Sequence, residues 1–114
     1  MNIFNFFLQN LPYPIWIEDL DTKIIFLNKA YEEMYNIELA NVLGKKNNDV
    51  LPNEISKLYA DKRESCIKTS SSITIESKIN NTYIECLIFP IKDQLGNIIA
   101  IGGLSRNINT RKKQ

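Results

Sequence analysis

The sequence predicts an α+β fold: one five-stranded antiparallel sheet, a helical insert on one face of the sheet, and an N-terminal helix. Two groups of strand-like segments, at residues 15–27 and 73–108, flank a stretch with helical periodicity. Short polar turns separate consecutive strands within each group, which is typical of antiparallel hairpins. At 114 residues, the chain fits a single domain.

A short amphipathic helix is predicted over about the first ten residues. Its apolar positions recur at helical spacing and are Phe4, Phe7, Leu8 and Leu11. Pro12 and Pro14 end the helix and force an extended chain. Two strands follow, at residues 15–18 and 23–27, joined by an aspartate-containing turn.

The middle of the chain is predicted to be helical. Asn28 can cap a helix, because its side chain can accept a hydrogen bond from an otherwise unpaired backbone N–H. That helix ends near Asn36, and its apolar face consists of Ala30, Tyr31, Met34 and Tyr35. A longer helix is predicted over residues 53–69. Its inward stripe consists of Ile55, Leu58, Tyr59, Lys62 or Arg63, Cys66 and Ile67.

Three strands are predicted in the last third, over residues 73–79, 82–91 and 98–108. Asn residues form the first of the two intervening turns, and residues 92–97 form the second. Gly102 and Gly103 fall inside the final strand. Two glycines in a strand indicate either a bulge or the close approach of another group.

Composition argues against several functions. The 14 basic and 13 acidic side chains give a net charge of +1, which favours neither nucleic acid nor an anionic membrane as a partner. The chain has no histidine, which excludes His-ligated haem and the Ser-His and Cys-His catalytic pairs. Asp19 and Asp21 share a tight turn and do not form an acid/base dyad. We therefore expect no catalytic residues, no metal ligands and no enzymatic activity in this chain.

Cys66 and Cys86 lie among apolar neighbours without metal-ligand spacing, so we expect buried free thiols. Free thiols suit a reducing cytoplasm. No apolar stretch is long enough to span a bilayer, so we expect no membrane contact by this domain.

Several short motifs, in this order and spacing, resemble those of PAS domains over essentially the whole chain. They are the opening at residues 11–16, the turn, strand and capping Asn at 19–31, the step containing Val42, Gly44 and Lys45, and the last hairpin at 89–98 with its glycine pair. Two positions depart from the family pattern. Thr22 stands where the turn usually has Gly, and the exit has Asn107, Ile108 and Asn109 where many members have Asp-Ile-Thr. A neutral latch could replace a charged one at Asn107.

The resemblance implies a sensory module that binds a small molecule in its core and relays a signal through a homodimer. The output domain, of the histidine kinase or diguanylate cyclase class, would lie outside residues 1–114. The alternative is a ligand-free dimerisation and relay module. A flavin-binding redox sensor is a further alternative, but residues 44–52 lack the Cys of photochemical flavin domains.

The resemblance also assigns candidate residues. The ligand-pocket candidates are Ile17, Leu27, Tyr31, Met34, Leu51, Tyr59, Arg63, Ile75, Cys86, Ile88, Gly103 and Ser105. They could equally be plain core packing. Tyr35 is a further polar group near them. Arg63 could bind a carboxylate ligand bidentately, or could be a solvated surface arginine.

Three segments follow from these expectations: a dimerisation or sheet-covering helix at 1–12, the PAS domain at 13–109, and the start of a linker at 110–114. Dimer-interface candidates are Phe4, Phe7, Leu8, Leu11 and Trp16, with Trp16 expected on the outer face of the sheet. Asn107 and Ile108 are the candidate signal exit.

Overall fold

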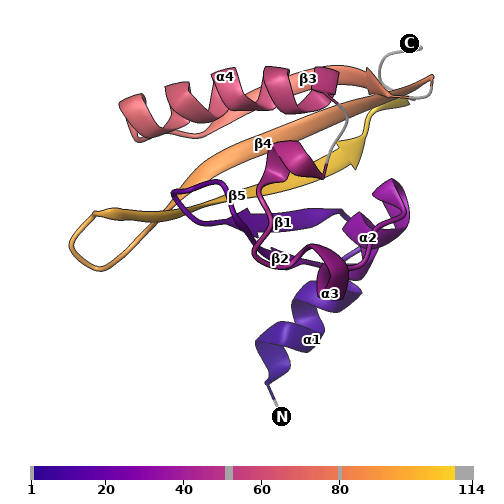
Figure 1. Ribbon diagram of the computed structural model, residues 1–114, viewed down its shortest axis with the longest axis horizontal. Helices are drawn as coiled ribbons and strands as arrows, with labels where there is room; N and C mark the ends of the chain where they lie inside the picture. Colours follow the sequence, from indigo (N-terminus) through magenta and orange to yellow (C-terminus); the bar gives the residue numbers. More distant parts are fainter. Residues whose placement is uncertain (1, 51–52, 80, 110–114) are drawn as a thin grey trace.

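The computed structural model describes residues 2–50, 53–79 and 81–109. A five-stranded antiparallel sheet has the strand order β2-β1-β5-β4-β3 (Figure 1). The strands are β1 (Ile15–Glu18), β2 (Ile24–Leu27), β3 (Ile73–Ile79), β4 (Thr82–Lys92) and β5 (Ile98–Asn107). The helices are α1 (Ile3–Asn10), α2 (Lys29–Tyr35), α3 (Leu39–Val42), the 3₁₀ turn η1 (Asn47–Asp49) and α4 (Asn53–Thr69). The predicted α+β fold is confirmed.

Helices α2 to α4 form the insert between the two groups of strands, and α4 lies along β3 and β4 (Figure 1). Helix α1 projects from the opposite end of the molecule. Among the described residues, no helix combines the length and apolar character needed to cross a bilayer.

Asn28 joins the N-terminal segment to the rest of the domain. Its Oδ1 accepts hydrogen bonds from the backbone N–H groups of Tyr31, at 3.0 Å, and Ile15, at 2.9 Å. Its Nδ2 donates to the carbonyl oxygens of Leu8 and Tyr13, at 3.0 and 2.9 Å. The predicted cap of α2 is therefore present. The same fully buried side chain also fixes the directions of α1 and β1.

The alternation of side chains in β1 is opposite to the one we expected. Trp16 is only 5% exposed and faces the core, whereas Ile17 pairs with Phe26 on the other face of the sheet. The expected positions of Trp16 on the outer face and of Ile17 in the pocket are both wrong. A strand four residues long with an apolar or long side chain at every position carries no clear alternation. Its orientation is determined by partners far away in the sequence.

Gly103 makes this orientation possible. It pairs with Trp16 across β1 and β5, and the six-membered ring of Trp16 occupies the space where a Cβ of residue 103 would lie. Of the two expectations for the glycine pair, the close approach is therefore observed at Gly103.

Thr22 adopts a left-handed backbone conformation, with φ of 67°. This is the conformation that glycine favours, and it is strained for a β-branched residue. The turn around it is held by the Asp19 carboxylate, which accepts from the backbone N–H groups of Asp21 and Lys23 at 2.9 Å each.

Candidate functional site

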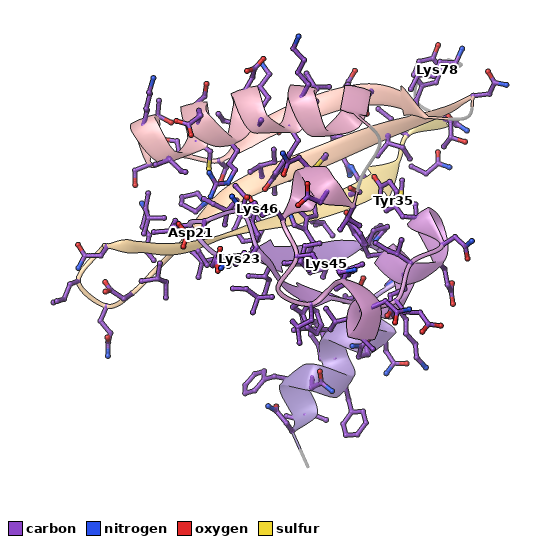
Figure 2. All side chains as sticks on the ribbon, viewed as in Figure 1. Asp21, Lys23, Tyr35, Lys45, Lys46 and Lys78 are labelled. Atoms are coloured by element: carbon purple, nitrogen blue, oxygen red, sulfur yellow. The ribbon has the colours of Figure 1, made fainter. Side chains whose placement is uncertain are left out.

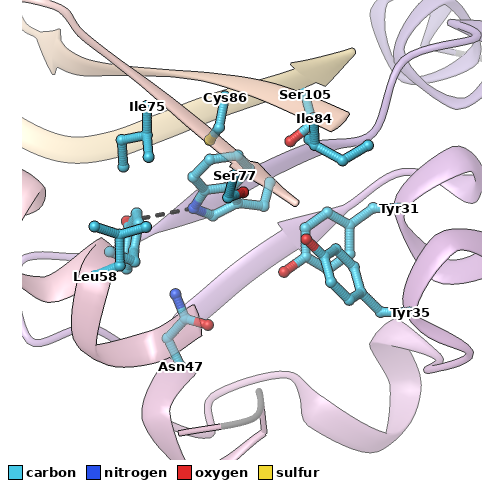
Figure 3. A pocket seen from close by; sticks show the side chains of 11 residues that line it. Tyr31, Tyr35, Asn47, Leu58, Ile75, Ser77, Ile84, Cys86 and Ser105 are labelled. Carbon is cyan, nitrogen blue, oxygen red and sulfur yellow. Dashed lines mark hydrogen bonds between the residues drawn. The ribbon is translucent and has the colours of Figure 1, made fainter. Parts of the chain in front are cut away.

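A cavity of about 50 Å³ lies between the inner face of the sheet and the helical insert (Figure 3). Side chains from α2, η1, α4 and four strands line it. They are Trp16, Tyr31, Tyr35, Asn47, Leu58, Tyr59, Ile75, Ser77, Ile84, Cys86 and Ser105. The cavity is therefore in contact with most helices and strands of the domain.

The structure brings together five of the predicted pocket residues at this cavity: Tyr31, Tyr59, Ile75, Cys86 and Ser105. The others do not line it. Leu27 and Ile88 are fully buried core residues, and Trp16 covers Gly103. Met34 lines a separate open groove, Arg63 lines a separate polar pocket, and Ile17 faces the other side of the sheet. Leu51 lies outside the described residues.

Sequence reasoning did not place Trp16, Asn47, Leu58, Ser77 and Ile84 at the cavity. Strand alternation could have found two of them, because Ser77 shares a face with Ile75, and Ile84 with Cys86. Leu58 belongs to the predicted inward stripe of α4. Asn47 follows a turn and carries no pattern in the sequence that points inward.

A buried ion pair lies beside the cavity. The Glu18 carboxylate is fully buried, and its Oε1 accepts hydrogen bonds from Arg63 Nε and Tyr59 Oη, both at 2.5 Å. Its Oε2 accepts from Asn47 Nδ2 at 3.2 Å. Trp16 Nε1 donates to Tyr59 Oη at 3.4 Å, which extends the network to the centre of the core.

Arg63 is therefore neither a solvated surface arginine nor free to receive a carboxylate at its Nε. Its side chain is 7% exposed and pairs with Glu18. Nη2 donates to the carbonyl oxygens of Asp19, at 3.2 Å, and Leu20, at 2.9 Å. Burial raises the pKa of Glu18, while hydrogen bonds from Tyr59 and Arg63 and the charge of Arg63 limit that rise. The pair ties α4 to β1 and to the turn after it.

Two tyrosine hydroxyls at the cavity have no partner among the described residues. Tyr31 is 5% exposed. Its backbone N–H donates to Asn28 Oδ1, but its hydroxyl makes no hydrogen bond with a described residue. Figure 3 shows the rings of Tyr31 and Tyr35 side by side, with their hydroxyl ends directed into the space that the lining residues surround. A buried hydroxyl without a partner, such as that of Tyr31, costs about 1–3 kcal/mol, so its position in the cavity is unfavourable unless another group binds it.

The described walls of the cavity carry no charged side chain near pH 7. Burial raises the pKa of Tyr35 to about 12 and also raises that of Tyr31. Burial raises the pKa of the Cys86 thiol to about 11, although the hydrogen bond with Ser105 lowers it slightly. A thiol that stays protonated is a poor nucleophile and metal ligand. Within the described residues, no cluster of His, Cys, Asp and Glu could hold a metal ion.

The candidate exit is fixed by amide side chains. Asn107 Oδ1 accepts from the backbone N–H of Asn109 at 2.8 Å, and Asn109 Oδ1 accepts from that of Tyr83 at 2.6 Å. Ile108 is buried, and its N–H donates to the Tyr83 carbonyl at 2.9 Å. The end of β5 is therefore held to the start of β4 by neutral hydrogen bonds.

The dimer-interface candidates occupy different environments. Phe4 and Phe7 are 75% and 61% exposed on α1, and Figure 2 shows side chains of α1 projecting away from the rest of the molecule. Leu8 and Leu11 are half-buried where α1 meets the domain. Trp16 is a core residue.

The comparisons with known proteins agree with this architecture. A family model described as the PAS fold matches residues 8–113. The chain is similar to the PAS domain of BvgS from Bordetella pertussis, with 17% identity and a TM-score of 0.80 over 97% of this chain and 88% of that one. It is similar to a sensory box sensor histidine kinase from Vibrio cholerae, with 17% identity and a TM-score of 0.77 over 94% and 90% of the two chains. A search of curated proteins found no match.

A five-stranded antiparallel sheet with a helical insert on one face defines this chain as an α+β domain. Because the family model covers nearly the whole sequence, the chain belongs to the PAS family. The resemblance indicated by the sequence is confirmed.

Proposed function

We propose that this chain is the sensory module of a larger signalling protein, and that a small molecule bound in the cavity controls an output domain of the histidine kinase or diguanylate cyclase class. The observation that carries the proposal is the cavity itself, because the buried Tyr31 and the half-buried Tyr35 present hydroxyl groups there that have no partner among the described residues. A PAS domain with a similar fold occurs in a sensor histidine kinase. Any catalytic activity would reside in the output domain. Two free cysteines without a disulfide favour a reducing cytoplasm.

Native mass spectrometry of the purified chain tests ligand binding. We expect an additional mass under native conditions that is lost on denaturation. The variant Ile75→Phe places extra atoms in a cavity of about 50 Å³ and should remove that mass. A bare native mass for the unmodified chain, even after incubation with a small-molecule extract, would contradict a sensory role.

A ligand-free relay module is the second candidate, and the small volume of the cavity favours it. Pockets that enclose drug-sized ligands measure roughly 300–1,000 Å³. The same comparison disfavours a flavin, whose fused ring system needs far more room than the described walls leave. A relay module would show the bare native mass and no response to added compounds.

We further propose that the chain relays its signal as a homodimer formed through α1. Four large apolar side chains of this helix are exposed: Ile3, Phe4, Phe6 and Phe7. None of the residues of α1 is buried, so the helix does not use this surface within its own chain. An exposed apolar patch on a helix is typical of an interaction site. A second copy would cover both helices symmetrically.

Sedimentation velocity of the variant Phe4→Ser/Phe7→Ser tests the dimer. We expect the unmodified chain to sediment as a dimer and the variant to dissociate at least about tenfold more readily, because two exposed anchors are lost. The substitutions leave the hydrogen bonds from Asn28 and Lys29 to Leu8 and Gln9 intact. Leu95→Ser is the matched control, since Leu95 is 85% exposed at the distant β4–β5 turn. Equal dimerisation of all three proteins would rule out α1 as the interface.

A further inference from the structure

We propose that the ligand of this cavity is a small uncharged molecule that both donates and accepts hydrogen bonds, of the primary amide class. This inference rests on the proposed function, since it assumes that the cavity binds a ligand. It goes further by assigning the chemical class from the groups that the cavity presents.

The cavity presents hydrogen-bond donors that have no partner among the described residues. Tyr31 is 5% exposed, and within the described part of the chain its hydroxyl makes no hydrogen bond. The Tyr35 hydroxyl and the Ser77 hydroxyl at the same cavity have no described partner either. The hydroxyls of Tyr31 and Tyr35 point into one space (Figure 3). A carbonyl oxygen placed there could accept from one or both of them.

Asn47 supplies a hydrogen-bond acceptor at the same cavity. Asn47 is 5% exposed and lines the cavity, and its Nδ2 donates to the Glu18 carboxylate at 3.2 Å. A carboxylate accepts only, so this contact fixes which end of the amide carries nitrogen. The Asn47 Oδ1 atom accepts no hydrogen bond from the described residues. The cavity therefore also presents a carbonyl oxygen that requires an N–H or O–H donor from a ligand.

The charge of the lining residues disfavours an ionic ligand. None of the described residues that line the cavity is Asp, Glu, Lys or Arg. The nearest charges in the network, Glu18 and Arg63, pair with one another at 2.5 Å. A charged ligand would lose its hydration and find no counter-ion, which is far more costly than burying a neutral polar molecule. From the sequence, a ligand carboxylate was considered as the partner of Arg63, but Glu18 of the chain itself occupies that position.

The volume and the apolar walls of the cavity limit the size and shape of a ligand. A cavity of about 50 Å³ has room for roughly three to five water molecules, taking on the order of 10–15 Å³ for each. That corresponds to a ligand of only a few non-hydrogen atoms. Leu58, Ile75 and Ile84 form apolar walls and suit a short alkyl group. An amide with a methyl or ethyl group satisfies the donors, the acceptor and the apolar walls together.

Three compounds of the same shape test the inference: acetamide, acetate and acetamidinium, which are neutral, anionic and cationic. Each is titrated into the ¹⁵N-labelled full chain, and ¹H–¹⁵N spectra are recorded at constant pH and ionic strength. We expect acetamide to shift saturably the backbone signals of residues around the cavity. Acetate and acetamidinium should bind at least about tenfold more weakly.

The variant Tyr31→Phe separates a specific hydrogen bond from simple filling of space. We expect it to weaken acetamide binding about two- to tenfold, the usual effect of losing one neutral hydrogen bond. Tyr13→Phe is the matched control, because Tyr13 is 45% exposed and does not line the cavity, and it should leave binding unchanged.

Equal or tighter binding of acetate or acetamidinium would overturn the inference, as would the absence of saturable shifts with acetamide or an unchanged affinity in Tyr31→Phe. Failure of the neutral ligand class can be told apart from failure of the proposed sensory function. A charged metabolite found by native mass spectrometry would uphold the sensory role and refute the neutral ligand class. Acetamide binding to a chain that carries no native ligand would support the class without the sensory role.

Discussion

Replacing Arg63 with methionine is expected to lower the free energy of unfolding by about 3–5 kcal/mol, the range found when one partner of a buried ion pair is removed. Glu18 is fully buried, and without the guanidinium it must either remain an unpaired buried charge or take up a proton, and both cost free energy near neutral pH. The two carbonyl oxygens of the β1–β2 turn would also lose their donor. A small domain has a total stability on the order of 5–15 kcal/mol, so the loss would be a large part of it.

Urea unfolding, followed by the fluorescence of Trp16, measures this effect, because Trp16 is the single tryptophan of the sequence and lies in the core. Arg106→Met is the matched control. It makes the same substitution in the pair of Arg106 with Glu85, where the arginine side chain is 51% exposed. Exposed pairs contribute about 0–1 kcal/mol. If the two variants lose equal stability, the buried pair does not stabilise the fold in the way proposed.

The pH dependence of Arg63→Met provides a second readout. Burial already raises the pKa of Glu18 above its ordinary value of 4.5, and the loss of Arg63 removes a hydrogen bond and a charge that lower it. An acid with a raised pKa in the folded state binds its proton more readily there, so stability falls as pH rises through the interval between the two pKa values. The deficit should therefore be smaller at pH 5 than at pH 7.5. Adding Glu18→Gln, which removes the buried charge, should restore part of the stability at pH 7.5.

Local sequence signals were sufficient for most of the fold. Asn28 could be identified as a cap because the features of a cap are contained within a few residues. The strands of the last third were predictable because β3 and β4 are long enough for alternation to show which side chains share a face. Five of the cavity residues, such as Tyr31 and Cys86, were assigned by the resemblance to PAS domains, which supplies the position of the pocket in the fold.

The orientation of β1 was not predictable in this way, because it depends on residues about 45 positions further along the chain. Placing a glutamate outside is the default for an isolated strand. Here Arg63 Nε and Tyr59 Oη both donate to Glu18 and allow it to be buried. The same rotation brings Trp16 into the core. The pattern of residues 15–18 alone cannot show that Glu18 is buried, because the residues that bond its carboxylate lie on α4.

The inward position of Trp16 leads to the second large effect. Replacing Gly103 with alanine is expected to destabilise the fold by about 3 kcal/mol or more, at the upper end of the range for overpacking. The new methyl group would overlap the six-membered ring of Trp16. The ring cannot move aside cheaply, because it packs edge-on against Tyr59 with centroids 5.7 Å apart and donates a hydrogen bond to it. Displacing it would also disturb the network around Glu18.

Gly102→Ala, one residue earlier in β5, is the matched control. Its methyl group would lie 3.0 Å from two ring atoms of Phe89, on the opposite face of the sheet, where Phe89 is only half-buried and can shift. We expect a cost of about 1 kcal/mol there. Urea unfolding followed by circular dichroism compares the two variants without relying on Trp16. Combining Gly103→Ala with Trp16→Leu should cost less than the sum of the two single changes, because the leucine leaves room for the methyl group. Additive losses, or equal losses for the two glycines, would show that the contact between Trp16 and Gly103 does not determine the orientation of β1.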